Sequence, residues 1–365
     1  MVKLKDIIRE IELYAPPIFQ ENYDNSGLIV GDSEMEIHGA IICLDAIESV
    51  IDEAIEKKCN LVIAHHPIVF SGLKSITGKN YIEKTIIKAI KNDIAIYAAH
   101  TNLDNVYNGV NQKIAQKLKL KNFTILDPMK TTLRKLQVLV PQTHYEIVRQ
   151  SILNAGAGNI GNYSNCSFNT QGIGTFQANK HANPYVGNIH EIHYENEYKV
   201  EVIFTKDKEN AIIQAMRDLH PYEEIAYDIL SLENTNPYIG AGLIGELENE
   251  CKPNEFLSLV KNAFQTACIR YTESTKNIKT VALCGGSGSF LLPRAIAKGA
   301  QAFLTADFKY HQFFDANQQV MIVDIGHYES EQYTGEIFLN IISEKFPNFA
   351  VHLTSVNTNP IKYYK

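Results

Sequence analysis

The sequence predicts an α/β protein in which a second, α+β domain is inserted into the first. Three observations carry this prediction. The first and last thirds of the chain alternate short apolar runs with stretches of helical periodicity. The middle third follows a different order. The chain has 365 residues, and at roughly 100–200 residues per domain this length indicates two domains.

The first third predicts strands separated by helices. Apolar runs at 40–44, 61–64 and 94–98 have the length and composition of buried strands. Helical spacing of apolar residues is found between and after them, at 49–57, 81–91 and 109–118. Strand–helix–strand units of this length are typical of a parallel sheet.

The last third repeats the pattern. Its predicted strands are 280–283, 302–304 and 320–323, and its predicted helices are 292–298 and 335–344. We therefore expect one discontinuous outer domain, made of residues 1–131 and 234–365, with mostly parallel sheets flanked by helices.

The middle third predicts a ferredoxin-like α+β domain. Its order is strand, helix, two strands, helix, strand, the split βαβ pattern. The clearest segments are strands at 136–140, 198–204 and 225–230 and helices at 145–155 and 210–219. We expect this insert to span residues 132–233.

Composition narrows the class of protein. A formal net charge of -7, from 34 Lys and Arg against 41 Asp and Glu, argues against a dedicated nucleic-acid binder. The 6 cysteines form no CxxC pair, which favours reduced thiols in the cytoplasm. No apolar run approaches the roughly 18 residues of a membrane span, and the N-terminal stretch lacks signal-peptide character. We expect a cytoplasmic protein with no membrane contact.

Polar side chains follow the predicted strands at the edge where α/β proteins place ligand sites. They are His65, His66, His100, Asp104, His327 and Glu331. A histidine at a strand end is most often part of a loop cap. Three such clusters that combine imidazoles with carboxylates instead favour a metal site for zinc, manganese, iron, cobalt or nickel.

The spacing of these residues predicts two divalent ions. Neighbouring side chains on a strand point apart, so we expect His65 and His66 to reach different ions. His327 and Glu331 are four residues apart and share one face of a helix start. Two ions roughly 3.5–4 Å apart need a bridge, for which Glu331 is the candidate, with Asp104 a terminal ligand.

Other candidates are less specific. His100 either binds metal or orients a ligand from outside, and we place it with Asp307 and His311 as candidate catalytic residues. Three interpretations hold for the segment with Asp307, Lys309 and His311. Its side chains contact a substrate anion, they donate protons, or the segment is a solvated loop. Two interpretations hold for 285–288: a phosphate cradle or a tight turn. Asn25, Ser26 and Asp45 are candidates for lining the cavity, and His220 favours a structural role.

Seven segments, in order along both outer thirds, resemble the NGG-interacting-factor-three-like family, also named GTP cyclohydrolase I type 2 homologs. They are NYDNSGLIVG (22–31), AHHPIVF (64–70), AAHTNLDN (98–105), GAGLIGEL (240–247), CGGSGSF (284–290), TADFKYH (305–311) and DIGHYESE (324–331). The insert is similar to CutA and PII signalling folds, most clearly in MRDLHPYEEIAYDI (216–229).

The resemblance implies metal ligands at His65, His66, Asp104, His327 and Glu331, with the two histidines on different metals and Glu331 bridging. It also implies a toroidal homohexamer whose sites face an internal cavity. Family members often have Trp where Tyr23 stands, and this chain has 0 Trp. We expect Tyr23 to form a wall near the site.

Two functions follow from these patterns. The first is a metal-dependent hydrolase that acts on a small molecule, for example a nucleotide such as GTP, or on a phosphoester. The second is a non-catalytic metal-binding assembly whose insert senses a ligand or docks a protein partner. The size of the insert favours the second, because a hydrolase does not need it. A third interpretation, nucleic-acid handling, is opposed by the net charge.

Overall fold

The computed structural model describes residues 2–364. These residues divide into two units. An outer unit joins the residues up to Pro128 with those from Pro237 onward, and an inserted unit spans Met129–Asn236. The predicted insert, residues 132–233, lies inside the second unit. The two units are described separately.

A five-stranded sheet forms the first half of the outer unit, in the order β17-β4-β5-β6-β2. Its strands are β2 (Gly27–Val30), β4 (Gly39–Asp45), β5 (Leu61–His66), β6 (Ala95–Ala98) and β17 (Ala350–Leu353). All neighbours are parallel except β2, which is antiparallel to β6. The central strands are buried on both faces, which explains their continuous apolar runs.

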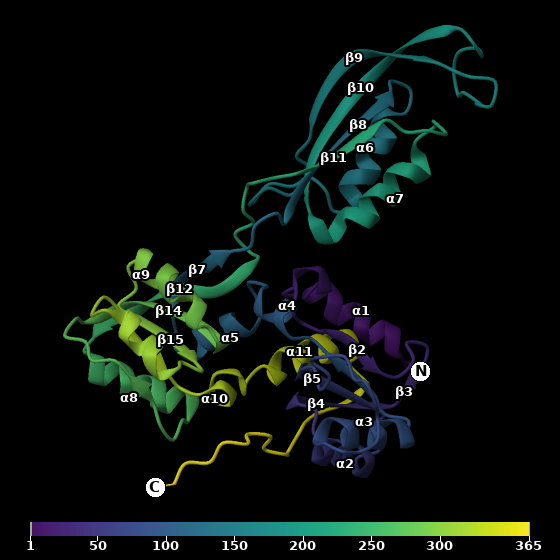
Figure 1. Ribbon diagram of the computed structural model, residues 1–365. Coiled ribbons are helices and arrows are strands. Elements are labelled where there is room, and N and C mark those ends of the chain that lie inside the picture. The colour runs from purple at the N-terminus through teal and green to yellow at the C-terminus, as the bar shows by residue number, and fades with distance from the viewer. Residues whose placement is uncertain (1, 365) are drawn as a thin grey trace. The chain divides into compact units, whose positions relative to one another are not determined.

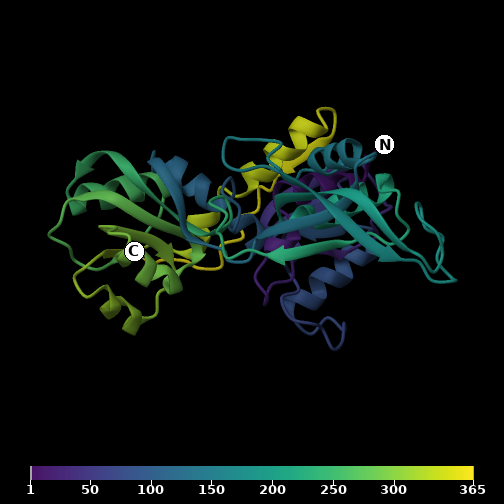
Figure 2. The same ribbon diagram turned by 90° about the horizontal axis from the view of Figure 1, so that it is seen from above.

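Helices cover both faces of this sheet (Figure 1). They are α2 (Glu48–Glu56) and α3 (Tyr81–Lys91) on one side and α1 (Leu4–Tyr14) and α11 (Gly335–Lys345) on the other. Leu4, Ile7 and Ile11 of α1 recur at helical spacing and are buried. Figure 2 shows the yellow α11 beside the purple N-terminal elements, so the end of the chain completes the domain that the beginning started.

A six-stranded sheet forms the second half, in the order β13-β16-β15-β14-β12-β7. Its strands are β7 (Lys121–Pro128), β12 (Gly240–Cys251), β13 (Arg270–Tyr271), β14 (Ile278–Ser287), β15 (Ala302–Ala306) and β16 (Met321–Asp324). Only the β14–β15 and β15–β16 pairs are parallel. The α/β class is confirmed, but the expectation of mostly parallel sheets is wrong here, because β7 and β12 flank the insert and pair antiparallel.

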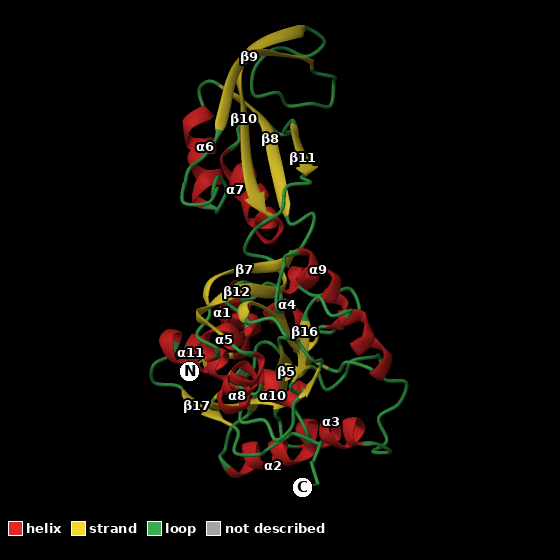
Figure 3. Ribbon diagram, turned by 90° about the vertical axis from the view of Figure 1, so that its left-hand side faces the viewer, coloured by secondary structure: helices red, strands yellow, loops and turns green. Residues whose placement is uncertain are grey.

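The inserted unit is a four-stranded sheet in the order β11-β8-β10-β9, with every pair antiparallel. Its strands are β8 (Leu133–Pro141), β9 (Phe168–Gln177), β10 (Ile192–Thr205) and β11 (Tyr227–Ser231). The helices α6 (Tyr145–Asn154) and α7 (Glu209–Leu219) pack side by side against one face of the sheet (Figure 3). This is the predicted ferredoxin-like order.

The remaining elements complete the description. In the outer unit they are β1 (Val2–Lys3), β3 (Glu36–Ile37), α4 (Thr101–Asp104), α5 (Val110–Lys117), α8 (Pro253–Phe264), α9 (Leu292–Ala297), α10 (His327–Glu331) and the 3₁₀ turns at Pro17–Phe19, Ser289–Leu291 and Tyr310–Ala316. A further 3₁₀ turn, Lys206–Lys208, lies in the insert. Within residues 2–364, no helix combines the length and apolar character required to cross a bilayer.

Candidate metal centre

One cavity of the outer unit collects the histidines and carboxylates that the sequence singled out. It measures about 380 Å³, and its lining includes His66, His100, Asp104, His327 and Glu331. His65 adjoins them, with its ring centroid 4.9 Å from that of His66 and none of its surface exposed. The structure thus brings together all six polar residues predicted at strand ends.

Three strand ends position these side chains. β5 carries His65 and His66 as its last two residues. α4 begins three residues after β6 and ends on Asp104. α10 follows β16 closely and runs from His327 to Glu331, so its first and last residues share one helix face. The site therefore forms where the carboxyl ends of strands from both sheets meet.

Three overlapping sets of side chains have donor atoms close enough to hold a cation. They are His65 with Asp104 and Glu331, His66 with His327 and Glu331, and His65 with His66 and His100. Within each set the donor atoms lie within 4.8 Å of one another. The first two sets share only Glu331, which makes its carboxylate the natural bridge between two neighbouring positions.

The two oxygens of Glu331 face different sets. Oε2 lies 3.0 Å from His66 Nε2 and 3.1 Å from His327 Nε2. Oε1 lies 3.9 Å from His65 Nε2, which in turn lies 3.5 Å from Asp104 Oδ1. The distances from Oε2 to His66 and His327 are those of hydrogen bonds. The distances from His65 Nε2 to Oε1 and to Asp104 Oδ1 are too long for hydrogen bonds.

Two buried atoms of the site have no hydrogen-bond partner in the described part of the chain: His65 Nε2 and Asp104 Oδ1. A buried polar atom without a partner costs roughly 1–3 kcal/mol, and more when it is charged. Both atoms are good ligands for a divalent cation. The unpartnered pair next to Glu331 is therefore the observation that best fits a metal.

Each of the four histidines is held from outside through Nδ1. The partners are the Ala99 carbonyl for His65 at 2.9 Å, Asp45 for His66 at 2.8 Å, Asp24 for His100 at 2.8 Å and Asp307 for His327 at 2.6 Å. All four partners accept a hydrogen bond, so each Nδ1 carries the proton. In His65 the Nε2 atom is then left without a partner, whereas in His66 and His327 it lies at hydrogen-bond distance from Glu331. An outer acceptor on Nδ1 that leaves Nε2 facing the site is the arrangement found around metal-binding histidines.

Burial and charge set the ionisation of the cluster. Complete burial lowers the pKa of His65 to about 3, so this ring is neutral and ready to bind a cation. Burial also raises the pKa of Asp104 well above its usual value, with the Glu331 charge adding to the effect. For Glu331, the charges and hydrogen bonds of His327 and His66 outweigh burial and hold its pKa well below the ordinary range.

The expected divergence of His65 and His66 is not what the structure shows. Their rings lie side by side, and one set of donor atoms contains both. The two residues are the last of β5, and His66 pairs only with the end of β4. β6 pairs with β5 only as far as Ala64, so both histidines lie beyond the last paired residue on that side of the strand. Assignment to different ions then depends on the separate partners Asp104 and His327.

The three candidate catalytic residues have different positions. His100 lines the cavity. Asp307 binds His327 and is held at a positive φ of 60°, which is uncommon for a residue with a side chain. His311 lies on the exposed 3₁₀ turn, packed against Tyr310 and Phe314, and is not part of the cavity lining. Lys309 is exposed on the same segment.

The glycine segment at the end of β14 allows close approach, and the amides of its three glycines already have partners within the chain, which argues against a phosphate cradle. Asn111 binds the amide of Gly285, Ser330 binds that of Gly286 and Thr305 binds that of Gly288. A Cβ on Gly286 would lie 2.5 Å from Glu331 Oε1, and its φ is +57°.

Some residues of the site had no clear sequence pattern. Asp24, which holds His100, lies 76 residues away from it, and Thr358 supports Asp45 with a hydrogen bond of 2.6 Å across 313 residues. Ser26 accepts from the His100 amide and Asn25 donates to the Val69 carbonyl. The end-of-strand rule that found the histidines also identifies Asp45.

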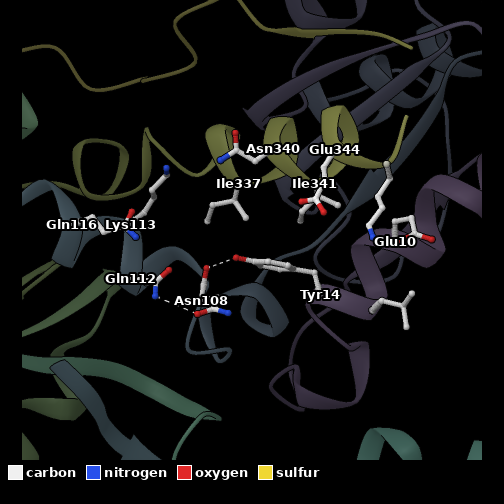
Figure 4. Close-up of a pocket in the computed structure, with 12 residues that line it drawn as sticks. Glu10, Tyr14, Asn108, Gln112, Lys113, Gln116, Ile337, Asn340, Ile341 and Glu344 are labelled. Atoms are coloured by element: carbon white, nitrogen blue, oxygen red, sulfur yellow. Dashed lines mark hydrogen bonds between the residues drawn. The ribbon is translucent and has the colours of Figure 1, made fainter. Parts of the chain in front are cut away.

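A larger cavity of about 450 Å³ lies between α1, α5 and α11 (Figure 4). Its lining has no histidine and includes the amides Asn108, Gln112, Gln116 and Asn340. Tyr14 crosses part of it and donates to the Asn108 carbonyl at 2.6 Å. Because it has no cluster of metal donors, the smaller cavity is the candidate site.

Fold and site together define a mixed α/β protein with a buried histidine–carboxylate cluster able to hold divalent metal. The chain is similar to two proteins that are both described as "GTP cyclohydrolase 1 type 2 homolog". The protein from Bacillus subtilis is 38% identical to it and the protein from Halalkalibacterium halodurans is 39% identical. Each match covers 98% of this chain and 98% of the relative. The solved structure of a Bacillus cereus protein related to NIF3 matches with a TM-score of 0.86 and 35% identity, over 100% of this chain and 99% of that one.

A Staphylococcus aureus structure matches with a TM-score of 0.79 and 28% identity, again over 100% of this chain and 99% of the other. The sequence pattern of the Duf34/NIF3 (NGG1p interacting factor 3) family matches residues 2–360. The chain belongs to this family, so the resemblance inferred from the seven motifs is confirmed.

Proposed function

We propose that the chain is a hydrolase that depends on two divalent metal ions bridged by Glu331. The observation that carries the proposal is the pair of overlapping donor sets, which meet at Glu331 beside two unpartnered buried atoms. His65 and Asp104 would hold one ion, and His66 and His327 the other. When bound, such ions supply Lewis-acid chemistry, polarising a substrate oxygen and making water more acidic near neutral pH.

His100 is the residue we propose for proton transfer. Its Nδ1 donates to Asp24, whose pKa is held well below the ordinary value because hydrogen bonds from His100 and Thr101 outweigh the effect of burial. The Asp24 carboxylate therefore stays ionised and orients the ring. Nε2 is left to face the cavity, where it can accept a proton from water or return one to a leaving group.

Aromatic side chains suit a flat substrate. Tyr23, Phe70 and Phe290 line the cavity, and the rings of Tyr23 and Phe70 lie 6.1 Å apart. We propose a small molecule with a planar ring, such as GTP, the substrate named in the description of the relatives, or an aryl phosphoester. The exposed rings would contact its apolar part while the histidine–carboxylate cluster faces the reacting bond.

Elemental analysis of the purified protein, combined with turnover assays, tests this function. Protein loaded with zinc or manganese should hold two ions per chain and turn over GTP or a member of a phosphoester panel. Glu331→Gln should lose metal and activity together. Glu336→Gln, a carboxylate on α11 paired with Lys113 and Lys117, is the matched control and should keep both.

Two results would contradict the proposal. One is a metal content near zero after metal-replete expression. The other is no turnover with any metal at a detection limit of about 10⁻⁴ per second, since typical enzymes run at roughly 1–10³ per second.

A second candidate function is a metal-binding regulatory assembly, favoured by the inserted unit. This unit has its own core and its own cavity of about 280 Å³. Pro128 and Gly240 are paired across β7 and β12, so a short glycine–serine linker can replace the insert without separating those strands. If metal binding and turnover survive this deletion, the insert is regulatory. If turnover is lost while metal binding persists, the insert contributes to catalysis.

We also propose that the chain assembles as a homohexamer, following the family resemblance. Sedimentation analysis of the full chain would give a mass near six times 41.1 kDa. A monomer or dimer at micromolar concentration would show that this expectation is wrong.

A further inference from the structure

The cavity of the inserted unit has the chemistry of a binding site in its own right. It measures about 280 Å³ and lies within residues 139–226. Three aromatic rings line it, from Phe176, Tyr185 and Tyr222, together with the carboxylate of Glu197. None of these residues belongs to the candidate metal centre, so their arrangement needs a separate explanation.

The aromatic rings form adjoining walls. The ring of Tyr222 lies 6.4 Å from that of Phe176 and 6.2 Å from that of Tyr185, centroid to centroid. Both pairs are tilted, at 58° and 46°, so the rings do not stack on one another. Aromatic faces arranged in this way attract cations through the negative charge above each ring.

Glu197 places a buried negative charge at the same cavity. It lies on β10 and is only 7% exposed. Its Oε1 accepts a hydrogen bond of 2.9 Å from the Tyr222 hydroxyl. Within the described residues, no lysine, arginine or histidine forms an ion pair with it. A buried carboxylate without a counter-charge is unfavourable, so this one suits a cationic partner from outside the chain.

A glycine on the neighbouring strand makes room for this carboxylate. Gly174 of β9 pairs with Glu195 of β10, and a Cβ on Gly174 would lie 2.1 Å from Glu197 Oε2. The remaining charges on the lining add to the negative potential, because Glu223 and Glu224 are present and the lining contains no lysine or arginine.

His220 holds the aromatic wall in place. Its Nδ1 accepts from the Tyr222 amide at 3.2 Å, and its Nε2 donates to the Leu139 carbonyl at 2.9 Å. Because one nitrogen accepts and the other donates, the ring is neutral. Burial lowers the pKa of His220, which also favours the neutral ring. The HPYEE segment thus supplies a positioning histidine, one ring of the wall and two of the carboxylates.

We propose that this cavity binds a small organic ammonium ion. The Glu197 carboxylate accepts an N–H of the ammonium group, while Phe176, Tyr185 and Tyr222 pack around the apolar part of the molecule. The volume lies close to the lower end of the range for small-molecule sites, roughly 300–1,000 Å³, which favours a compact amine. The site is independent of the metal centre and of any reaction there.

Calorimetry on the full chain with two matched probes tests the proposal. Phenethylamine and 2-phenylethanol share one carbon skeleton and differ in carrying an ammonium or a hydroxyl group. We expect phenethylamine to bind at least about tenfold more tightly than the alcohol, the ratio that corresponds to one charge-assisted hydrogen bond. Equal affinities, or no binding of the amine, would overturn the proposal.

Three variants locate the binding. Glu197→Gln should weaken phenethylamine binding at least about tenfold and leave the alcohol unchanged. Glu195→Gln is the matched control, because it removes the same charge from the same strand and is not part of the cavity lining; it should bind like the wild type. Phe176→Leu keeps the carboxylate, removes one ring and should also weaken the amine, so the test does not depend on the folding of a single variant.

Two outcomes at this stage would refute the proposal. Amine binding that is unchanged in both Glu197→Gln and Phe176→Leu would place the amine elsewhere. Binding of a lysine-containing peptide without binding of free phenethylamine would show that the site reads a protein side chain instead of a small molecule.

Discussion

Asp45 offers a direct test of the metal centre, because it touches the site only through His66. Its Oδ1 accepts from His66 Nδ1 at 2.8 Å, and its Oδ2 accepts from the Thr358 hydroxyl at 2.6 Å. Asp45→Asn keeps an oxygen that can accept from His66 but removes the charge. Asp45→Ala removes the hydrogen bond as well. The two substitutions should therefore weaken metal binding in that order.

The expected magnitude follows from the role of such partners. Loss of the outer partner of a metal-binding histidine typically costs 10–100-fold in affinity, or about 1.4–2.7 kcal/mol. We expect Asp45→Asn near the lower limit, because the hydrogen bond remains, and Asp45→Ala near the upper limit. Competition with a chromogenic chelator measures the affinity for zinc, and thermal unfolding without metal reports on the fold.

Asp52→Asn is the matched control. Asp52 lies on α2 with its side chain 60% exposed and pairs with Lys88, so the same charge is removed away from the site. The control should bind zinc like the wild type. If both Asp45 variants also bind like the wild type while remaining folded, His66 does not depend on its carboxylate partner, and its assignment as a ligand would be wrong.

Three further predictions concern metal and stability. Gly286→Ala should reduce metal content by elemental analysis, because its Cβ would crowd Glu331 at 2.5 Å; full metal content would contradict the close approach. At 100 times its dissociation constant, zinc should stabilise the chain by about 2.7 kcal/mol in thermal unfolding, whereas Glu331→Gln should show no shift, and an equal shift would exclude Glu331 as a ligand. The pKa of Glu53 is lowered to about 2, because hydrogen bonds from Lys57, Thr354 and Ser355 outweigh the effect of burial. These hydrogen bonds to the charged carboxylate should add about 1.5–3 kcal/mol to the free energy of unfolding at neutral pH.

The pH dependence of the last effect has a definite sign. The pKa of Glu53 is lower in the folded chain than its ordinary value of 4.5, so its stabilisation is present above that value and is lost as the pH falls toward about 2. The gap in unfolding free energy between wild type and Glu53→Gln should narrow over this interval. A gap that stays constant with pH would show that the charge of Glu53 does not stabilise the fold.

The elements that the sequence predicted well are those whose pattern is local. The buried parallel strands β4, β5 and β6 appear as continuous apolar runs because both of their faces are covered. β12 was not predicted as a strand, because Gly240, Gly242 and Gly245 interrupt its pattern. Its antiparallel pairing with β7 depends on residues on either side of the insert, and no local pattern encodes that.

In the candidate site, too, the sequence predicts residues that have a local pattern and does not predict contacts between distant residues. The end-of-strand rule and the family motifs indicated His65, His66, Asp104, His327 and Glu331, and the structure brings all of them to one cavity. The outer partners that orient the histidines could not be inferred, because their contacts span large separations in sequence. Spacing in the sequence indicates which chemical groups are present. Only the folded chain shows which nitrogen of each histidine is bound by its outer partner and which nitrogen faces the site.

The late position of α10 and β17 has a consequence for synthesis on the ribosome. A nascent chain that has reached residue 320 already carries His65, His66 and Asp104, but it lacks Glu331 and the strand that pairs with β4. Until those residues emerge, one edge of the five-stranded sheet stays open, while the insert can already fold as a unit. If Glu331 bridges two ions as proposed, metal capture marks the moment at which translation has delivered the closing segments, and a prematurely released fragment cannot complete that site.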